Sequence, residues 1–263
     1  PEKRRPTDQP EVFTMEQALS VALSRQMTLR RAMDIVANNV ANVNTSAYKA
    51  ESPIFSEFLM PGATADDRKG AGTIPALSFV QDTGTHRDLS EGNITPTGNP
   101  FDIAIAGDGF FAVQTPAGER YTRSGHFAVD VNGQLVTPQG DPVLSAAGAP
   151  ITLNPDDGQI AISRDGTISA GENTIGRLGV VTFDNQRAMK KTGDTYLETD
   201  QAAQPVANPS VIQGSIESSN VKSVVEMTRM IEVMRAYTST QKNINKLGEL
   251  QESAIRQLGR EPR

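Results

Sequence analysis

Few side chains in this sequence have the chemistry that catalysis or metal binding requires. The 263 residues include two histidines, His86 and His126, and no cysteine. Without cysteine there are no disulfides, thiolate metal sites or cysteine nucleophiles. The two histidines lie far apart in the chain and no third one joins them, so they do not provide the ligand set of a zinc site. We therefore predict no cofactor and no metal.

Acidic side chains in the middle of the chain are the remaining candidates for chemistry. A carboxylate-based hydrolase needs two of them placed across a cleft. Asp108, Asp157 and Asp165 each precede a glycine, which is the usual place of an aspartate in a turn. The sequence has no phosphate-binding loop, no dinucleotide-binding glycine pattern and no complete calcium loop. We expect that the protein is not an enzyme.

Three asparagines, Asn38, Asn39 and Asn42, crowd the end of a predicted helix. Helix propensity gives no reason for three amides at that place. An amide both donates and accepts hydrogen bonds, so these side chains suit helix–helix or subunit contacts that need directional bonds. The pattern points to assembly rather than to catalysis.

The elements that would position these amides are long amphipathic helices at both ends of the chain. Apolar residues recur there at alternating spacings of three and four, which is typical of a heptad seam. The N-terminal spacing predicts a core helix over residues 15–46, with contact residues Leu29, Met33, Val36 and Val40. The C-terminal spacing predicts a core helix over residues 217–263, with contact residues Met227, Met230, Ile231, Met234 and Tyr237.

Between the two helices the apolar period falls to two, which is typical of strands. Asn132 and Gly133 separate two such runs and predict a hairpin, because both residue types tolerate a positive φ. We predict a central β-domain over residues 75–200. Residues 47–74 and 201–216 are expected to be linkers, and residues 1–14, which are rich in proline and charge, a disordered extension.

Composition excludes several classes of function. The net charge is −6, the aromatic content is 5% and tryptophan is absent, which disfavours polyanion binding and base stacking. No apolar run is long enough to span a membrane. The first residues lack the uninterrupted apolar region of a signal peptide, so no cleaved signal is expected.

Together these patterns predict an α+β fold. Long amphipathic helices at the N- and C-termini would form a coiled-coil-like, tube-building core, and a central antiparallel all-β domain would join them. The β-domain is too small to cover both apolar seams, so the seams must pack on each other, on other subunits, or on both. Contacts between subunits that do not close into a ring generate helical tubes.

Several segments carry a resemblance to a known family. Residues 33–45 read MDIVANNVANVNT and residues 47–49 read AYK, which resembles the signature of flagellar basal-body rod, hook and hook-associated axial proteins. Ala47 stands where that signature usually has glycine. The segments NPFDIAIAGDGFFAV (99–113), RYTRSGHF (120–127), QGSIESSNV (213–221) and EMTRMIEVMRAY (226–237) are also similar to this family. Among the members of this family, the sequences of these segments are most similar to the rod protein that adjoins the distal rod.

The resemblance implies a structural subunit of the periplasm-spanning rod, which transmits torque from the rotor ring to the hook. It also implies export by the flagellar type III apparatus without a cleaved signal. Expected partners are copies of this chain, other rod subunits and the export apparatus, with no nucleic acid, small-molecule substrate or membrane insertion. Alternatives are a distal rod or hook paralogue, a sugar-binding or adhesive β-domain on a coiled-coil stalk, and a peptidoglycan hydrolase.

Overall fold

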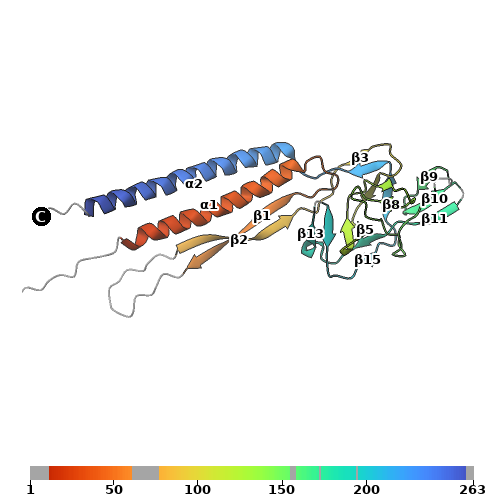
Figure 1. Ribbon diagram of the computed structural model, residues 1–263, viewed down its shortest axis with the longest axis horizontal. Helices are drawn as coiled ribbons and strands as arrows, with labels where there is room; N and C mark the ends of the chain where they lie inside the picture. The colour runs from red at the N-terminus through yellow and green to blue at the C-terminus, as the bar shows by residue number, and fades with distance from the viewer. Residues whose placement is uncertain (1–11, 61–76, 155–157, 172, 194, 259–263) are drawn as a thin grey trace, which may run out of the picture. The chain divides into compact units, whose positions relative to one another are not determined.

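The computed structural model describes residues 12–60, 77–154, 158–171, 173–193 and 195–258 of the chain (Figure 1). Residues 1–11 of the predicted disordered extension lie outside the described residues. The described chain divides into two compact units. The first, here called the helical unit, comprises residues up to 38, residues 51–86 and residues from 224 onward. The second, the β-unit, comprises residues 39–50 and 87–223.

The helical unit combines two long helices with a two-stranded ribbon. Helix α1 spans Val12–Ala41, helix α2 spans Ser223–Leu258, and strand β1 (Glu51–Met60) pairs with strand β2 (Leu77–Arg87). The two helices lie side by side (Figure 1). Polar contacts join them, since Gln26 Nε2 of α1 donates to Tyr237 Oη at 3.2 Å and to Gln241 Oε1 of α2. Arg31 of α1 forms an ion pair with Asp82 of β2 at 3.4 Å. These contacts assemble segments from both ends of the chain into one unit.

The predicted coiled-coil-like, tube-building core was wrong, although an α+β composition agrees with the structure. Within the described residues there is one helix at each end, around a β-rich central region. The apolar side chains assigned to the seam do not all face one partner helix, because Met227, Ile231 and Met234 are exposed. Where a seam would have an apolar pair, Gln26 forms hydrogen bonds to α2 instead.

Element boundaries also differ from the sequence-based ones. Helix α1 ends at Ala41 and turns follow it, whereas α2 begins only at Ser223. Strand β1 occupies residues expected to be a linker. Strand β16 (Ser210–Gln213) does as well, since it pairs with β4 (Ile103–Ala106) and thereby buries Val211. The strand depends on this pairing with a distant segment, which the local sequence does not indicate.

The β-unit is built from short antiparallel strands. Its largest sheet has six strands in the order β13-β14-β6-β5-β12-β15, and a second sheet has three in the order β11-β10-β9. Pairs β16-β4, β17-β3 and β7-β8 complete the described pairings. The remaining bounds are β3 (Ile94–Pro96), β5 (Phe110–Thr115), β6 (Gly118–Thr122), β7 (Ala128–Val129), β8 (Leu135–Val136), β9 (Ile160–Ile162), β10 (Thr167–Ala170), β11 (Asn173–Arg177), β12 (Val180–Thr182), the 3₁₀ turn η2 (Gln186–Ala188), β13 (Lys190–Thr192), β14 (Tyr196–Glu198), β15 (Gln204–Pro205) and β17 (Ser215–Glu217).

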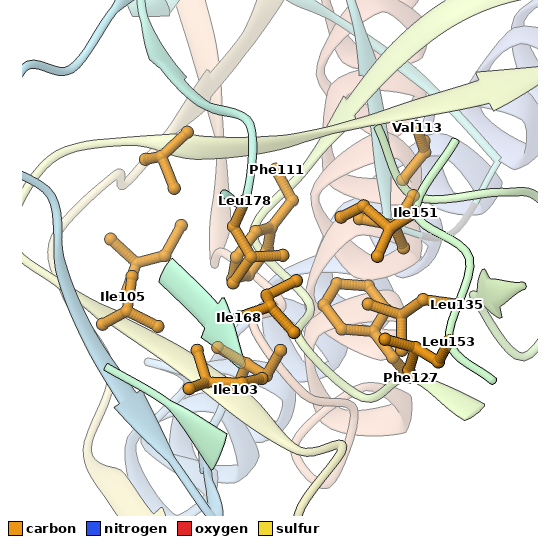
Figure 2. Packing of buried hydrophobic residues seen from close by; sticks show 14 residues of the cluster. Ile103, Ile105, Phe111, Val113, Phe127, Leu135, Ile151, Leu153, Ile168 and Leu178 are labelled. Atoms are coloured by element: carbon orange, nitrogen blue, oxygen red, sulfur yellow. The ribbon is translucent and has the colours of Figure 1, made fainter. Parts of the chain in front are cut away.

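Strand β5 shows how the β-unit is packed on both faces. Alternate residues of a strand point to opposite sides, so Phe111 and Val113 enter one apolar cluster while Phe110 and Ala112 enter another. The first cluster also takes residues from other strands and loops, among them Ile103, Ile105, Phe127, Leu135, Ile168 and Leu178 (Figure 2). Figure 2 shows these side chains pointing toward one another. A core on each side makes this strand the centre of the unit.

The hairpin at Asn132 and Gly133 is present. Strand β7 pairs with β8 through Ala128 with Val136 and Val129 with Leu135. Gly133 has a φ of +78°, the left-handed region that glycine adopts without steric cost. None of the helices in the described segments is long and apolar enough to cross a membrane.

Candidate assembly interface

Helix α2 exposes four large apolar side chains along one face of its first half. We call Val224, Met227, Ile231 and Met234 the α2 stripe, and their exposed fractions are 75%, 53%, 53% and 52%. Spacings of three and four place them on one side of the helix. Folded monomers rarely expose so many large apolar side chains in a row unless the surface binds a partner. This stripe has the character of a contact surface.

A neighbouring face of α2 is covered. Glu226 and Thr240 are each 6% exposed, and Met230, Tyr237 and Ile244 are half-buried. The helix is therefore anchored by this face, and the α2 stripe lies beside it. Further along, the outward positions become polar, with exposed Thr238, Lys242, Asn245 and Glu249. In the described part of α2 beyond the stripe, exposed large apolar side chains recur only near the end of the helix, at Leu250 and Ile255.

Other segments of the helical unit also expose apolar side chains. On α1, Leu23 and Met27 are one helical turn apart and 44% and 74% exposed. On β1, Ile54, Phe55 and Phe58 are exposed. The apolar spacing in the sequence did not select any of these residues. Their apolar type is visible in the sequence, but only the fold determines that they are left uncovered.

The structure separates the predicted contact residues into three groups. Met227, Ile231 and Met234 are exposed on α2, and Asn38 is exposed on α1. Val36 and Asn39 are buried within the chain, at 1% and 0% exposure. The others are half-buried, namely Leu29, Met33, Val40, Asn42, Met230 and Tyr237. The exposed group presents the most surface to another subunit, and the buried group presents almost none.

Two of the three signature amides have partners just after α1 in the same chain. Asn39 Oδ1 accepts a hydrogen bond from Tyr48 Oη at 3.2 Å, and Asn42 Oδ1 accepts one from Thr45 Oγ1 at 3.0 Å. These bonds fold the chain back after the helix ends. Ala47 in this turn has a φ of +55°, a left-handed conformation that explains why related signatures have glycine there.

A buried charge cluster follows the same turn. Lys49, which ends the signature, contacts Glu217 with 2.6 Å between Nζ and Oε1, and both side chains are almost fully buried. Burial lowers the pKa of Lys49 below its usual value, and the hydrogen bond to Glu217 partly opposes this shift. The two residues are 168 positions apart in the sequence. No signal in a single sequence identifies such a pair.

The side chains first considered for chemistry do not form a catalytic arrangement. His86 is exposed on β2, and His126 Nδ1 lies 2.7 Å from Oδ1 of the buried Asp102. His126 borders a pocket of about 280 Å³ that is lined mainly by hydroxyl side chains. In the described segments no three His, Asp or Glu side chains come together as metal ligands. Asp108 and Asp165 lie in turns, and Asp157 lies outside the described residues.

Three family models match separate parts of this chain. The model described as "Flagella basal body rod protein" matches residues 19–49. The "Flagellar hook protein FlgE/F/G D1 domain" matches residues 104–170, within the β-unit. The "Flagellar basal body rod FlgEFG protein C-terminal" model matches residues 212–257, which include most of α2. The matches follow the order helix, β-unit, helix.

Curated relatives extend the similarity over nearly the whole chain. A flagellar basal-body rod protein FlgF of Caulobacter vibrioides is 44% identical over 94% of this chain and 99% of its own length. Another FlgF, from Mesorhizobium japonicum, is 37% identical over 93% of this chain and 99% of its own length. A rod protein FlgG of Bacillus subtilis is 30% identical over 92% of this chain and 98% of its own length.

Proposed function

This chain belongs to the flagellar basal-body rod proteins, of the FlgF type, and from that premise we propose how it is built into the rod. It is a structural subunit of the flagellar basal body and assembles with other basal-body subunits. The α2 stripe packs against neighbouring rod subunits, and the exposed side chains of α1 and β1 extend the contact. The subunits that cover this surface are copies of this chain and adjacent rod proteins.

The observation that carries this proposal is the exposure of the α2 stripe. About half or more of each of its four side chains is in contact with solvent. Burial of a large apolar side chain contributes roughly 1.5–3 kcal/mol, so covering the stripe supplies a substantial part of the contact free energy. A polar stretch of α2 follows the stripe, which limits the contact to one part of the helix.

The proposal also covers the location of the rod in the cell and the torque that the rod transmits. The subunit reaches the periplasm through the flagellar type III export apparatus, and there its contacts carry torque from the rotor ring toward the hook. Support comes from family membership and from the chain's lack of cysteine, since a chain without thiols cannot mispair after it enters an oxidising space.

An aspartate in the α2 stripe tests the proposal. The Ile231→Asp variant is expressed in a flagellated bacterium whose own copy of this gene has been deleted. We expect the variant to be made and folded but absent from purified basal bodies. An unpaired charge buried in the contact costs several kcal/mol, and every 1.4 kcal/mol lowers the association constant about tenfold. The measurements are circular dichroism of the purified chain and an immunoblot of detergent-extracted basal bodies.

Asn245→Asp is the matched control. Asn245 is exposed and lies about four helical turns beyond Ile231 on the same face, in the polar part of α2. This variant introduces the same carboxylate, and we expect it to be incorporated and to restore swimming. Normal incorporation of Ile231→Asp would overturn the assignment of the α2 stripe as a subunit contact.

A further inference from the structure

A single buried carboxylate in the β-unit binds two cations. Glu217 is 1% exposed, and both of its carboxylate oxygens are occupied. Oε1 accepts hydrogen bonds from Lys49 Nζ at 2.6 Å and from the Gly92 amide at 2.8 Å. Oε2 accepts one from Arg123 Nε at 2.5 Å. Three segments that are distant in the sequence therefore meet at this one side chain.

Arg123 extends the contact to the neighbouring loop. Its Nη2 donates to the Gly107 carbonyl at 2.6 Å and its Nη1 to the Gly109 carbonyl at 3.2 Å. Glu91 lies 3.4 Å from the same guanidinium and adds a second negative charge. Two cations and two carboxylates thus balance, which is the condition under which buried charges are tolerated.

Asn220 joins the backbone of two further segments close by. Its Oδ1 accepts a hydrogen bond from the Ala50 amide at 2.8 Å. Its Nδ2 donates to the carbonyls of Asp88 at 2.9 Å and Ser90 at 3.2 Å. Ser90 O also accepts from Lys49 Nζ at 2.6 Å, which links Asn220 to the charge cluster. We call Lys49, Arg123, Glu217 and Asn220 the Glu217 node.

The Glu217 node lies close in the sequence to the places where the chain passes from one unit to the other. The chain passes between the helical unit and the β-unit after residues Asn38, Ala50, His86 and Ser223. The node directly binds three segments that adjoin three of these passages, namely residues 47–50, 88–91 and 217–220. The hydrogen bond between Asn39 and Tyr48 ties the fourth passage to the segment that carries Lys49. All four passages are thus cross-linked inside the β-unit.

Stability alone does not account for such a cluster. Removal of two charges from water costs several kcal/mol per ion, so an apolar cluster of the same volume often stabilises as well or better. Charged and amide groups supply direction instead, because each bond fixes which atoms lie opposite one another. Lys49, Arg123, Glu217 and Asn220 also come from three different segments that resemble rod and hook proteins.

We propose that the Glu217 node is a mechanical joint within the β-unit, which holds the chain segments beside the four passages in fixed register so that they do not slip past one another under load. This role rests on the proposed rod function, because only a load-bearing subunit needs such a joint. Glu217, Lys49, Arg123 and Asn220 are positioning residues in this role, and none of them has to contact another subunit.

Asn220→Ala tests the joint in the purified full-length chain. Two backbone amides beside the passages serve as reporters. Asp88 N–H donates to Ala50 O at 2.9 Å and Ala47 N–H donates to Glu217 O at 2.8 Å, so the substitution of Asn220 removes neither acceptor. We expect hydrogen exchange at both amides to rise by about tenfold. In cells we expect normal incorporation into basal bodies, with swimming that slows more than wild type as viscosity increases.

Gln213→Ala is the matched control. The Gln213 amide also bridges three backbone groups, with Oε1 accepting from Ile162 N at 3.0 Å and Nε2 donating to Pro100 O at 3.0 Å and Ile160 O at 3.1 Å. It does not adjoin the bonds of Asp88 and Ala47. We expect unchanged exchange at those two amides and no extra loss of speed at high viscosity.

Several results would overturn the joint. These are unchanged exchange at Asp88 and Ala47 in Asn220→Ala, a viscosity response equal to that of Gln213→Ala, and absence of the folded variant from basal bodies. If Asn220→Ala does not fold, Asn220→Asp decides, since it keeps the acceptor for Ala50 and loses the donor to Asp88 and Ser90. The rod assignment itself is tested separately by Ile231→Asp, so the two failures are distinguishable.

Discussion

Individual polar side chains of the β-unit are held by partners that alter their titration. Tyr196 Oη donates to Asp141 Oδ2 at 2.7 Å and lies 2.8 Å from Thr137 Oγ1. Burial and the nearby carboxylate raise the pKa of Tyr196 to about 12, and burial is the larger cause. Burial, together with Glu119, also raises the pKa of Tyr121 to about 12. These phenols remain protonated in the folded chain at a pH where unfolded tyrosine ionises.

The pH dependence of stability follows from these two tyrosines. A folded-state pKa above the unfolded value of about 10 contributes stability that is complete below pH 10 and is lost as the pH rises toward 12. We expect the urea midpoint to fall across this range. In Tyr196→Phe the fall should be shallower, because one of the two phenols is gone. An identical slope in wild type and Tyr196→Phe would contradict the assigned environment of Tyr196.

At the scale of elements, α1 and α2 use their apolar residues differently. On α1, Ile35 and Val36 are buried, whereas the α2 stripe is exposed. A substitution at a buried position of α1 therefore acts first on the fold of this chain, and one in the α2 stripe acts first on assembly. The same seam spacing in the sequence selects the buried Val36 and the exposed Met227, Ile231 and Met234, and it does not distinguish these roles.

Val36→Asp tests this difference. Val36 is 1% exposed, so an aspartate there is buried without a partner and costs several kcal/mol of stability. We expect a lower unfolding temperature and less helical circular dichroism in the purified chain. The control is Ala37→Asp, since Ala37 is the exposed next residue of α1. If both variants melt at the wild-type temperature, Val36 does not belong to the core of the chain.

Particular residues show which elements were predictable from the sequence. The terminal helices follow from apolar spacings of three and four, and the hairpin from Asn132 and Gly133, because both signals are local. Strand β16 has no such local signal, since it depends on β4 about 100 residues earlier in the chain. The pairing of Lys49 with Glu217 is likewise a contact between distant segments, which the fold alone creates.

The same limit applies to the candidate interface. Met227 and Met230 are both apolar and three residues apart, yet the first is exposed and the second is half-buried. The heptad pattern selects both, because it reports residue type and periodicity and not what covers each face. For this reason the sequence predicted a coiled-coil-like core where α2 in fact leaves one apolar face uncovered.

At the scale of the whole molecule, assembly and load are borne by different parts of the chain. The α2 stripe in the helical unit provides the contact with other subunits, and the Glu217 node within the β-unit fixes the passages of the chain. Family models match both ends and the β-unit, as this division of roles leads us to expect. The central claim is that the α2 stripe becomes buried when the subunit enters the rod.

The most direct test is the accessibility of position 231 before and after assembly. The chain has no cysteine, so Ile231→Cys carries a single thiol whose maleimide labelling is measured in the purified subunit and in intact basal bodies. We predict rapid labelling in the free subunit, where Ile231 is 53% exposed, and protection in basal bodies that is lost after denaturation. Equally rapid labelling in intact basal bodies would contradict the account.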